Sequence, residues 1–326
     1  MRYVLRRLGF YLLAAWASLT LNFVIPRLAP GDPATAMFAR FEGRLSPEAL
    51  VALRAAFGFT EAPWHVQYLT YLEHLVTGDM GLSYAYYPSR VSEVIGTGLL
   101  WTVGLAGCAV VISFALGTAL GVLAAWNRGG CLDSALAPVL AFLGAFPYFW
   151  LAMLALYLFG FGLGWFPLRH AYSHDVEPGL TLSFLADMGR HAVLPAMSIV
   201  VATLGGWMLG MRNTMVAVLG TDTLRLAHAK GLPPRRVMWR YAARNALLPN
   251  VTGFGMALGF VLSGSLLTEI VFSYPGTGYL LILAVRNQDY PLMQGLFLVI
   301  TLAVLAANFA VDLLCLWLDP RTRAHA

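Results

Sequence analysis

The amino-acid sequence predicts an all-α polytopic membrane protein with six transmembrane helices, on the evidence of its composition and its apolar runs. Of the 326 residues, 59% are hydrophobic and 11% are charged, which excludes an ordinary soluble domain and a disordered chain. Each apolar run is long enough to cross a hydrocarbon core of roughly 30 Å. The six runs cover residues 8–26, 99–126, 134–160, 191–219, 247–271 and 292–317.

The distribution of charge orients these spans. Seven Arg or Lys residues and one acid lie between Arg212 and Arg244, whereas residues 27–97 hold five Arg and seven acids. The positive-inside rule keeps the basic connection in the cytoplasm. An even number of spans then places both termini there. This asymmetry is typical of a protein oriented in the lipid bilayer and is poor evidence for nucleic-acid binding.

The first apolar run follows Arg6 and Arg7 and has two interpretations. A secretory signal peptide also begins with basic residues, and residues 34–36 (Ala-Thr-Ala) resemble a cleavage site. The run is longer than the apolar core of a signal peptide, which has about 7 to 15 residues. We therefore expect residues 1–26 to form a retained cytoplasmic end and the first transmembrane helix.

Residues 27–97 are predicted to form an external helical subdomain. A first short helix is expected from Ser46 to Gly58, where Ser-Pro-Glu starts it and glycine ends it. A second amphipathic helix is expected from Trp64 to Leu75, ahead of Gly78. The remaining chain divides into a five-helix core at 98–318 and a cytoplasmic tail at 319–326.

The basic cytoplasmic loop at 220–247 is predicted to form two helices. Thr221 or Asp222 caps the first, and Gly231 suits the left-handed position that ends it. Leu224, Ala227 and His228 fall on one face of this helix.

The second helix opens at Pro234 and carries Arg236, Arg240 and Arg244 on one stripe beside Val237, Tyr241 and Leu248. Its arginines are expected to meet lipid headgroups or a partner protein. Two interpretations of the whole loop are open, a docking surface for a partner and a basic loop that only sets topology.

Three polar residues lie in or beside the later spans: Glu269, Asn308 and Asp312. An acid within a membrane is a candidate for contact with a transported substrate, and it is equally explained by a position at the interface or by pairing with an arginine. His170 and His174, near Asp175 and Glu177, suggest a metal site less well than a solvated external loop.

Catalytic signatures are absent from the sequence. It has no Gly-x-Ser-x-Gly and no His-Glu-x-x-His. Lys230 is the only lysine and Gly231 follows it, so a phosphate-binding Gly-x-x-x-x-Gly-Lys-Ser/Thr loop cannot exist. The chain is therefore not an ATPase by itself, and we expect no cofactor in it.

Several ordered segments together resemble the binding-protein-dependent ABC transporter permeases. The similarity is greatest to the B-type subunit of the oligopeptide, dipeptide and nickel branch, and it covers nearly the whole chain. The segments are 29–33 (Ala-Pro-Gly-Asp-Pro), 78–83 (Gly-Asp-Met-Gly-Leu-Ser), 222–232 with 244–249 (Arg-Asn-Ala-Leu-Leu-Pro), 269–278 (Glu-Ile-Val-Phe-Ser-Tyr-Pro-Gly-Thr-Gly), 287–291 (Asn-Gln-Asp-Tyr-Pro), 308–312 (Asn-Phe-Ala-Val-Asp) and 319–321 (Asp-Pro-Arg). The Glu-Ala-Ala of the general permease motif is Arg-Leu-Ala at 225–227 here, so no glutamate contact is expected at that place.

The resemblance implies a type I ABC importer permease (MetI-like) architecture in a bacterial or archaeal cell (inner) membrane. It implies a similar second permease subunit as heterodimer partner, two ATPase subunits that hold ATP and Mg²⁺, and an external substrate-binding protein. The coupling helix that fits a groove on one ATPase is then residues 222–232. Its contact residues are Asp222, Leu224, Arg225, Ala227, His228, Ala229, Lys230, Gly231 and Leu232.

The resemblance favours short peptides as cargo, and nickel, glutathione and oligosaccharides remain alternatives. A secondary transporter driven by an ion gradient is the competing class. Such transporters often carry inverted repeats with helices broken at the midplane, and the sequence shows no convincing internal repeat.

Overall fold

The computed structural model describes residues 2–28 and 62–318, and within these ranges it is built of helices with no β-strand. The helices before the basic loop are α1 (Arg2–Leu28), α4 (Trp64–Thr77), α5 (Val91–Thr102), η1 (Val103–Gly107), α6 (Cys108–Trp126), η2 (Leu132–Leu136), α7 (Ala137–Gly144), α8 (Tyr148–Ala155), η3 (Leu156–Gly162) and α9 (Leu182–Leu219). Those that follow are α10 (Asp222–Ala229), α11 (Pro234–Arg236), η4 (Val237–Ala243), α12 (Arg244–Ala246), α13 (Leu248–Gly264), α14 (Leu266–Phe272), α15 (Thr277–Arg286) and α16 (Tyr290–Leu318). The η segments are π-helical.

Four described helices are long and apolar enough to cross a membrane, and the number rises to six if each of two bent pairs counts as one span. The four are α1, the continuous α5–η1–α6 of 36 residues, α9 and α16. The bent pairs are η2–α7 with α8–η3, which turn by 98°, and α14 with α15, which turn by 75°. The number of predicted spans equals the upper end of this range, although the fifth predicted run, 247–271, covers α13 and α14 and the second bent pair is α14 with α15.

The third predicted span, 134–160, is broken into two helices. The helix ends at Gly144 and a new one begins after Pro147. Proline has no N–H to donate and disfavours helical geometry at Phe146 before it, so the hydrogen-bonded ladder cannot continue. Hydropathy alone does not detect the break because the residues on both sides are apolar.

Other boundaries also differ from the apolar runs. The second span begins at Val91, inside the predicted external segment, and the fourth begins at Leu182, where Thr181 accepts a hydrogen bond from the Phe184 N–H. The fifth run is divided at Ser265 into α13 and α14. Helices extend past their apolar stretches because polar residues in a helical turn do not interrupt the backbone hydrogen bonds of the helix.

The described part of the external segment contains the predicted amphipathic helix. α4 ends at Gly78, which adopts φ +74° and caps the helix. Tyr68 packs edge-to-face on Phe23 of α1 with ring centroids 5.1 Å apart, and its hydroxyl lies 2.8 Å from that of Thr20. The helix predicted at 46–58 lies outside the described residues.

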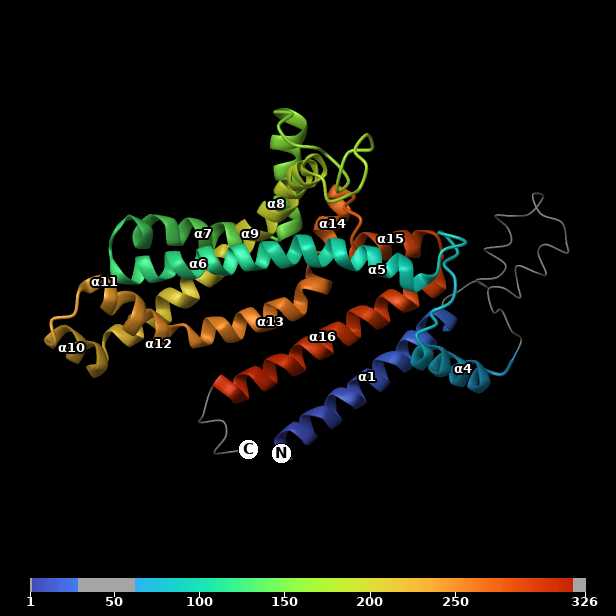
Figure 1. Ribbon diagram of the computed structural model, residues 1–326, viewed down its shortest axis with the longest axis horizontal. Helices are drawn as coiled ribbons and strands as arrows, with labels where there is room; N and C mark the ends of the chain where they lie inside the picture. The colour runs from blue at the N-terminus through green and yellow to red at the C-terminus, as the bar shows by residue number, and fades with distance from the viewer. Residues whose placement is uncertain (1, 29–61, 319–326) are drawn as a thin grey trace.

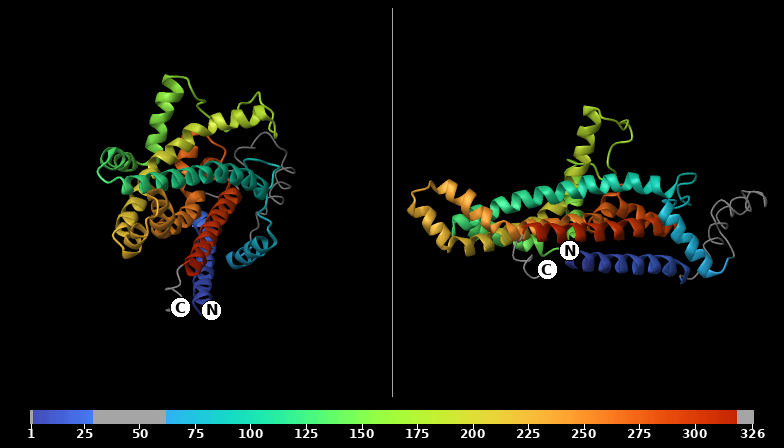
Figure 2. Two further views of the ribbon diagram at one scale, coloured as in Figure 1. Left: turned by 60° about the vertical axis from the view of Figure 1, so that its left-hand side comes forward. Right: turned by 60° about the horizontal axis from the view of Figure 1, so that its bottom comes forward.

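α1 and α16 run antiparallel and side by side, so the start of the first helix lies beside the end of the last (Figures 1 and 2). Arg7 forms an ion pair of 3.0 Å with Asp312, and the Tyr11 hydroxyl donates to the same carboxylate at 2.8 Å. At one end of the molecule are α10, α11 and α12, and α4 lies toward the opposite end (Figure 1).

α6 and α9 pack against each other more extensively than any other pair of described helices. A Cβ atom on Gly121 would lie 2.5 Å from the carbonyl oxygen of Met208, so only glycine allows this approach. Small residues permit such contact between membrane helices. The close packing fixes the ends of α6 and α9 relative to each other, and the basic loop rests on these ends.

Candidate functional site

The first helix of the basic loop forms where the sequence predicts it. α10 follows Thr221, which has extended backbone geometry, and ends at Lys230. Gly231 adopts φ +70°, and its N–H donates to the His228 carbonyl at 2.9 Å. Pro234 then occupies the first turn of α11. The helix therefore has a defined start and a defined end.

One face of α10 is anchored in the protein. Leu224 is 1% exposed and Ala227 is 3% exposed. They belong to a buried apolar cluster that joins α10 to the ends of α6 and α9 and to the segment after it. Its other buried members are Val122, Ala125, Met211, Met215, Val237, Met238, Ala242, Ala243 and Ala246. The inner face of α10 is therefore packed against the ends of two long helices, α6 and α9.

The opposite face of α10 is exposed to solvent. Leu226 is 57% exposed, and Arg225 forms an exposed ion pair of 3.2 Å with Asp222. The other exposed residues here are Thr223, His228, Ala229, Lys230 and Gly231, and Leu232 is half-buried. The His228 ring stacks on Trp126 with centroids 6.4 Å apart. An exposed leucine beside both signs of charge suits contact with another protein.

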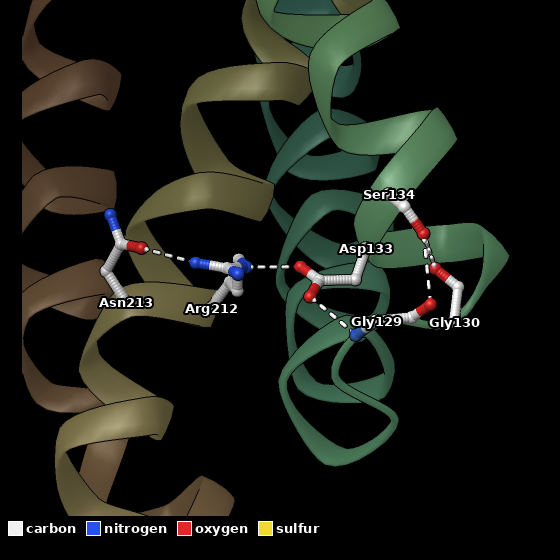
Figure 3. A network of polar contacts seen from close by, with 6 residues as sticks. All are labelled: Gly129, Gly130, Asp133, Ser134, Arg212 and Asn213. Atoms are coloured by element: carbon white, nitrogen blue, oxygen red, sulfur yellow. Dashed lines mark hydrogen bonds and ion pairs between the residues drawn. The ribbon is translucent and has the colours of Figure 1, made fainter.

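A polar network fixes the start of the third predicted span against α9 (Figure 3). The Arg212 guanidinium pairs with Asp133, whose other carboxylate oxygen accepts from the Gly129 N–H at 3.0 Å. The Ser134 hydroxyl donates to the carbonyl of Gly130 at 2.6 Å. The turn at 127–130 is therefore held to the same part of α9 that supports α10.

We expect Asp133→Asn to lower the thermal midpoint of unfolding more than a change at an exposed ion pair, because it removes a charge-assisted hydrogen bond between α9 and the start of the third predicted span. The matched control is Asp222→Asn, whose pair with Arg225 is exposed and contributes about 0–1 kcal/mol. Thermal unfolding of both purified variants in detergent measures the difference. Equal shifts for the two variants would contradict the structural role of the Asp133 pair.

Glu269 is fully buried and holds the bend between α14 and α15. Its carboxylate accepts hydrogen bonds from the hydroxyls of Ser265 and Thr102 at 2.8 Å each. It also accepts from the backbone N–H groups of Gly278 at 2.8 Å and Tyr279 at 3.3 Å, at the start of α15. Negative charge is favourable at a helix N-terminus. Glu269 therefore joins α5, α14 and α15.

Sequence comparison places the chain among known proteins. Residues 117–324 match the family model described as binding-protein-dependent transport system inner membrane component. The chain belongs to this family. The permease is 36% identical to the di/tripeptide transport system permease protein DppB of Pseudomonas aeruginosa (strain UCBPP-PA14), with 98% of each chain covered. It is 34% identical to the dipeptide transport system permease protein DppB of Escherichia coli (strain K12), with 99% of each covered, and 31% identical to the oligopeptide transport system permease protein AppB of Bacillus subtilis (strain 168), with 98% of each covered.

Family membership confirms the architecture and the functional class expected from the motifs. The permease is an inner membrane component of a binding-protein-dependent ABC transport system, a class of component that is generally not catalytic. The matched residues include the whole basic loop and both bent helix pairs, η2–α7 with α8–η3 and α14 with α15.

The structure shows the surroundings of the three polar residues that the sequence predicts as candidates for contact with the substrate. Glu269 is enclosed by the four donors described above, and Asp312 pairs with Arg7 and Tyr11. Asn308 is half-buried on α16, four positions from Asp312. The structure does not bring Glu269 and Asp312 together, and a role for any of the three in translocation stays a prediction.

Two histidines of the permease, His170 and His174, lie close together. The rings of His170 and His174 have centroids 5.2 Å apart. Across residues 2–28 and 62–318, no group of three or more His, Cys, Asp or Glu side chains has the arrangement of a metal site. The expectation that the chain holds no metal stays a prediction.

Two structurally important groups were not identified from the sequence. Thr102 lies between Glu269 and α15, and its hydroxyl accepts from the Thr277 N–H at 2.8 Å. Asp289 is fully buried and accepts from the Ser83 hydroxyl and from the Ala85 N–H at 2.9 Å. Asp289 thus joins segments 78–83 and 287–291. The sequence had indicated only that these two segments resemble the family.

Proposed function

We propose that this permease is one of two similar subunits that enclose the path of an ATP-driven importer for short peptides. The similarity to the two transporters named for dipeptides or di/tripeptides and to the one named for oligopeptides supports this cargo. A substrate-binding protein outside the cell delivers the peptide, and two ATPase subunits in the cytoplasm hold ATP and Mg²⁺. The single lysine of the permease leaves it without a phosphate-binding loop of its own.

The observation that carries the proposal is that α10 is buried on one face and exposed on the other. Its inner face is packed on the ends of α6 and α9, and its outer face presents Leu226, Arg225 and Asp222. The outer face fits a groove on an ATPase subunit. Closure of the two ATPases then displaces α10, and the buried face passes this displacement to the membrane helices, which alternate between inward-open and outward-open states. A flexible loop would absorb the same displacement.

Substitutions of the two leucines of α10 distinguish an effect on docking from an effect on folding, because one leucine is exposed and the other is buried. Leu226→Ala is expected to weaken association with the ATPase by about fivefold or more, since truncating a central interface residue costs about 1 kcal/mol or more. Its thermal midpoint should equal that of the wild type because Leu226 is exposed. Leu224→Ala is the matched variant, and it should lower stability by about 2–5 kcal/mol because it opens a cavity. Copurification with the ATPase subunits and thermal unfolding provide the two readouts. Unchanged association of Leu226→Ala would show that this face does not dock.

Transport measurements test the whole proposal. Vesicles containing the reconstituted complex should take up short peptides only with ATP and the binding protein. Insensitivity to ATP, with loss of uptake when an ion gradient is dissipated, would identify a secondary transporter instead. Binding assays on the partner binding protein, with peptides, oligosaccharides, glutathione and nickel chelates side by side, decide the cargo.

The orientation of the chain is part of the proposal, with α10 and both termini in the cytoplasm. The positive-inside rule supports it. A cysteine at His228 should react with a membrane-impermeant maleimide only in inside-out vesicles, because this side chain is exposed on α10. Labelling of the same cysteine in intact cells would exclude the coupling role of α10.

A further inference from the structure

A second charged surface lies beside α10 and faces away from the protein. Arg235, Arg236, Arg240 and Arg244 are all exposed along α11, η4 and α12, and Trp239 among them is 46% exposed. Val237, Met238, Ala242 and Ala243 lie between these arginines in the sequence and belong to the buried cluster under α10. The segment therefore has a basic aromatic face and an apolar face, and we call the former the arginine surface.

No acid of the described chain neutralises the arginine surface. The ion pairs found in residues 2–28 and 62–318 involve other cations, and none includes Arg235, Arg236, Arg240 or Arg244. The only acid of the loop is Asp222, and it pairs with Arg225 on α10. Four guanidinium groups are thus presented together, and their mutual repulsion favours an anionic partner.

The position of α11, η4 and α12 in the fold indicates which anionic partner the arginine surface meets. The apolar face of this segment packs on Met211 and Met215 of α9, on either side of Arg212, and on the end of α6 close to Trp126. Arginine and tryptophan side chains at helix ends are typical of the lipid headgroup level. α13 starts at Leu248, directly after this segment, and that leucine is also exposed.

We propose that the arginine surface binds the phosphate groups of anionic phospholipids in the cytoplasmic leaflet. Guanidinium groups bind phosphate oxygens in bidentate fashion, and tryptophan occupies the headgroup region. The two faces of the loop then have different partners. α10 presents a leucine and both signs of charge to a protein, whereas the arginine surface presents only positive charge and an aromatic ring.

Lipid binding to the purified full-length permease tests the proposal. The variant carries Arg236→Gln, Arg240→Gln and Arg244→Gln. The matched control carries Arg90→Gln, Arg169→Gln and Arg286→Gln, three exposed arginines outside the loop. Native mass spectrometry counts the lipids retained from detergent micelles containing phosphatidylglycerol or phosphatidylcholine. Each arginine near an anionic surface contributes about fivefold in affinity, so three contribute on the order of a hundredfold.

The expected result is a preference for phosphatidylglycerol in the wild type and in the control that the loop variant loses. The preference should also decrease with added salt, because exposed charges are screened. Equal thermal midpoints in phosphatidylcholine would confirm that the loop variant is folded. If the folded variant retains the wild-type preference, the arginine surface does not bind lipid. If it retains that preference and no longer copurifies with the ATPase, the arginines serve the ATPase and the proposal is wrong. A variant that misfolds is replaced by single Arg→Gln variants, each of which should lose about fivefold.

Discussion

Gly231→Pro is expected to reduce ATP-driven uptake by more than tenfold while the protein still inserts in the membrane. Gly231 has φ +70°, and proline is restricted to about −65°. The substitution also removes the N–H that donates to the His228 carbonyl at 2.9 Å. The end of α10 must therefore unwind or turn elsewhere, and the face that carries Leu226 is no longer held. Uptake of a labelled dipeptide into vesicles, normalised to the amount of permease, measures the effect.

Gly231→Asn is the matched control for this experiment. Asparagine adopts left-handed backbone geometry more readily than other non-glycine residues and keeps the N–H. A Cβ atom at position 231 would meet no other atom within 4 Å, so the added side chain has space. Uptake should stay within about twofold of the wild type, since the αL penalty is roughly 1–2 kcal/mol at most. Wild-type uptake by the proline variant would refute the coupling role of α10, and equal losses in both variants would mean that backbone geometry is not the cause.

The second large effect is expected at Glu269. Glu269→Ala leaves the N–H groups of Gly278 and Tyr279 and the hydroxyls of Ser265 and Thr102 without their acceptor in a buried place. An unsatisfied buried donor costs about 1–3 kcal/mol. We expect a total loss of about 3–5 kcal/mol, as for other broken buried charge networks. Thermal or denaturant unfolding in detergent measures this loss.

The close approach of Gly276 to Glu269 provides a specific test of the role of the Glu269 carboxyl group. A Cβ atom there would collide with the Glu269 carboxyl group, and all three of its nearest atoms belong to that group. Gly276→Ala should therefore destabilise the wild type and cost much less in Glu269→Ala. The coupling between the two substitutions should be at least about 1 kcal/mol. Gly278→Ala is the control, because its Cβ would also collide with the backbone of Leu266, which remains when Glu269 is truncated. Additive effects of Glu269→Ala and Gly276→Ala would contradict the contact.

The contacts of Glu269 also bear on how α5, α14 and α15 move. Thr102 is the last residue of α5 before the π-helical segment η1, and it contacts both Glu269 and Thr277. One carboxylate thus holds α5, α14 and α15 together. These three helices are expected to move as one unit when the permease changes state.

The helix at 222–229 was predictable because its signals are local. The start at Thr221, the left-handed Gly231 and the proline at 234 act within a few residues of their own positions, and the face of Leu224 and Ala227 follows from helical spacing. The break at Pro147 was also local, but the predicted span passed over it because apolar length was the criterion. The π-helical geometry of 237–243 had no recognised signal in the sequence.

Apolar run length, charge asymmetry and the ordered motifs of this chain were enough to predict a helical membrane permease with a coupling helix at 222–232. They were not enough to predict which polar side chains meet. Glu269 and Thr102 are 167 positions apart, Asp133 and Arg212 are 79 apart, and Tyr11 and Asp312 are 301 apart. Helix packing decides these pairs, because a buried polar group takes whichever partner the surrounding helices bring within hydrogen-bonding distance. The tertiary structure alone therefore assigns Glu269 to the bend between α14 and α15 and Asp312 to the contact between α1 and α16.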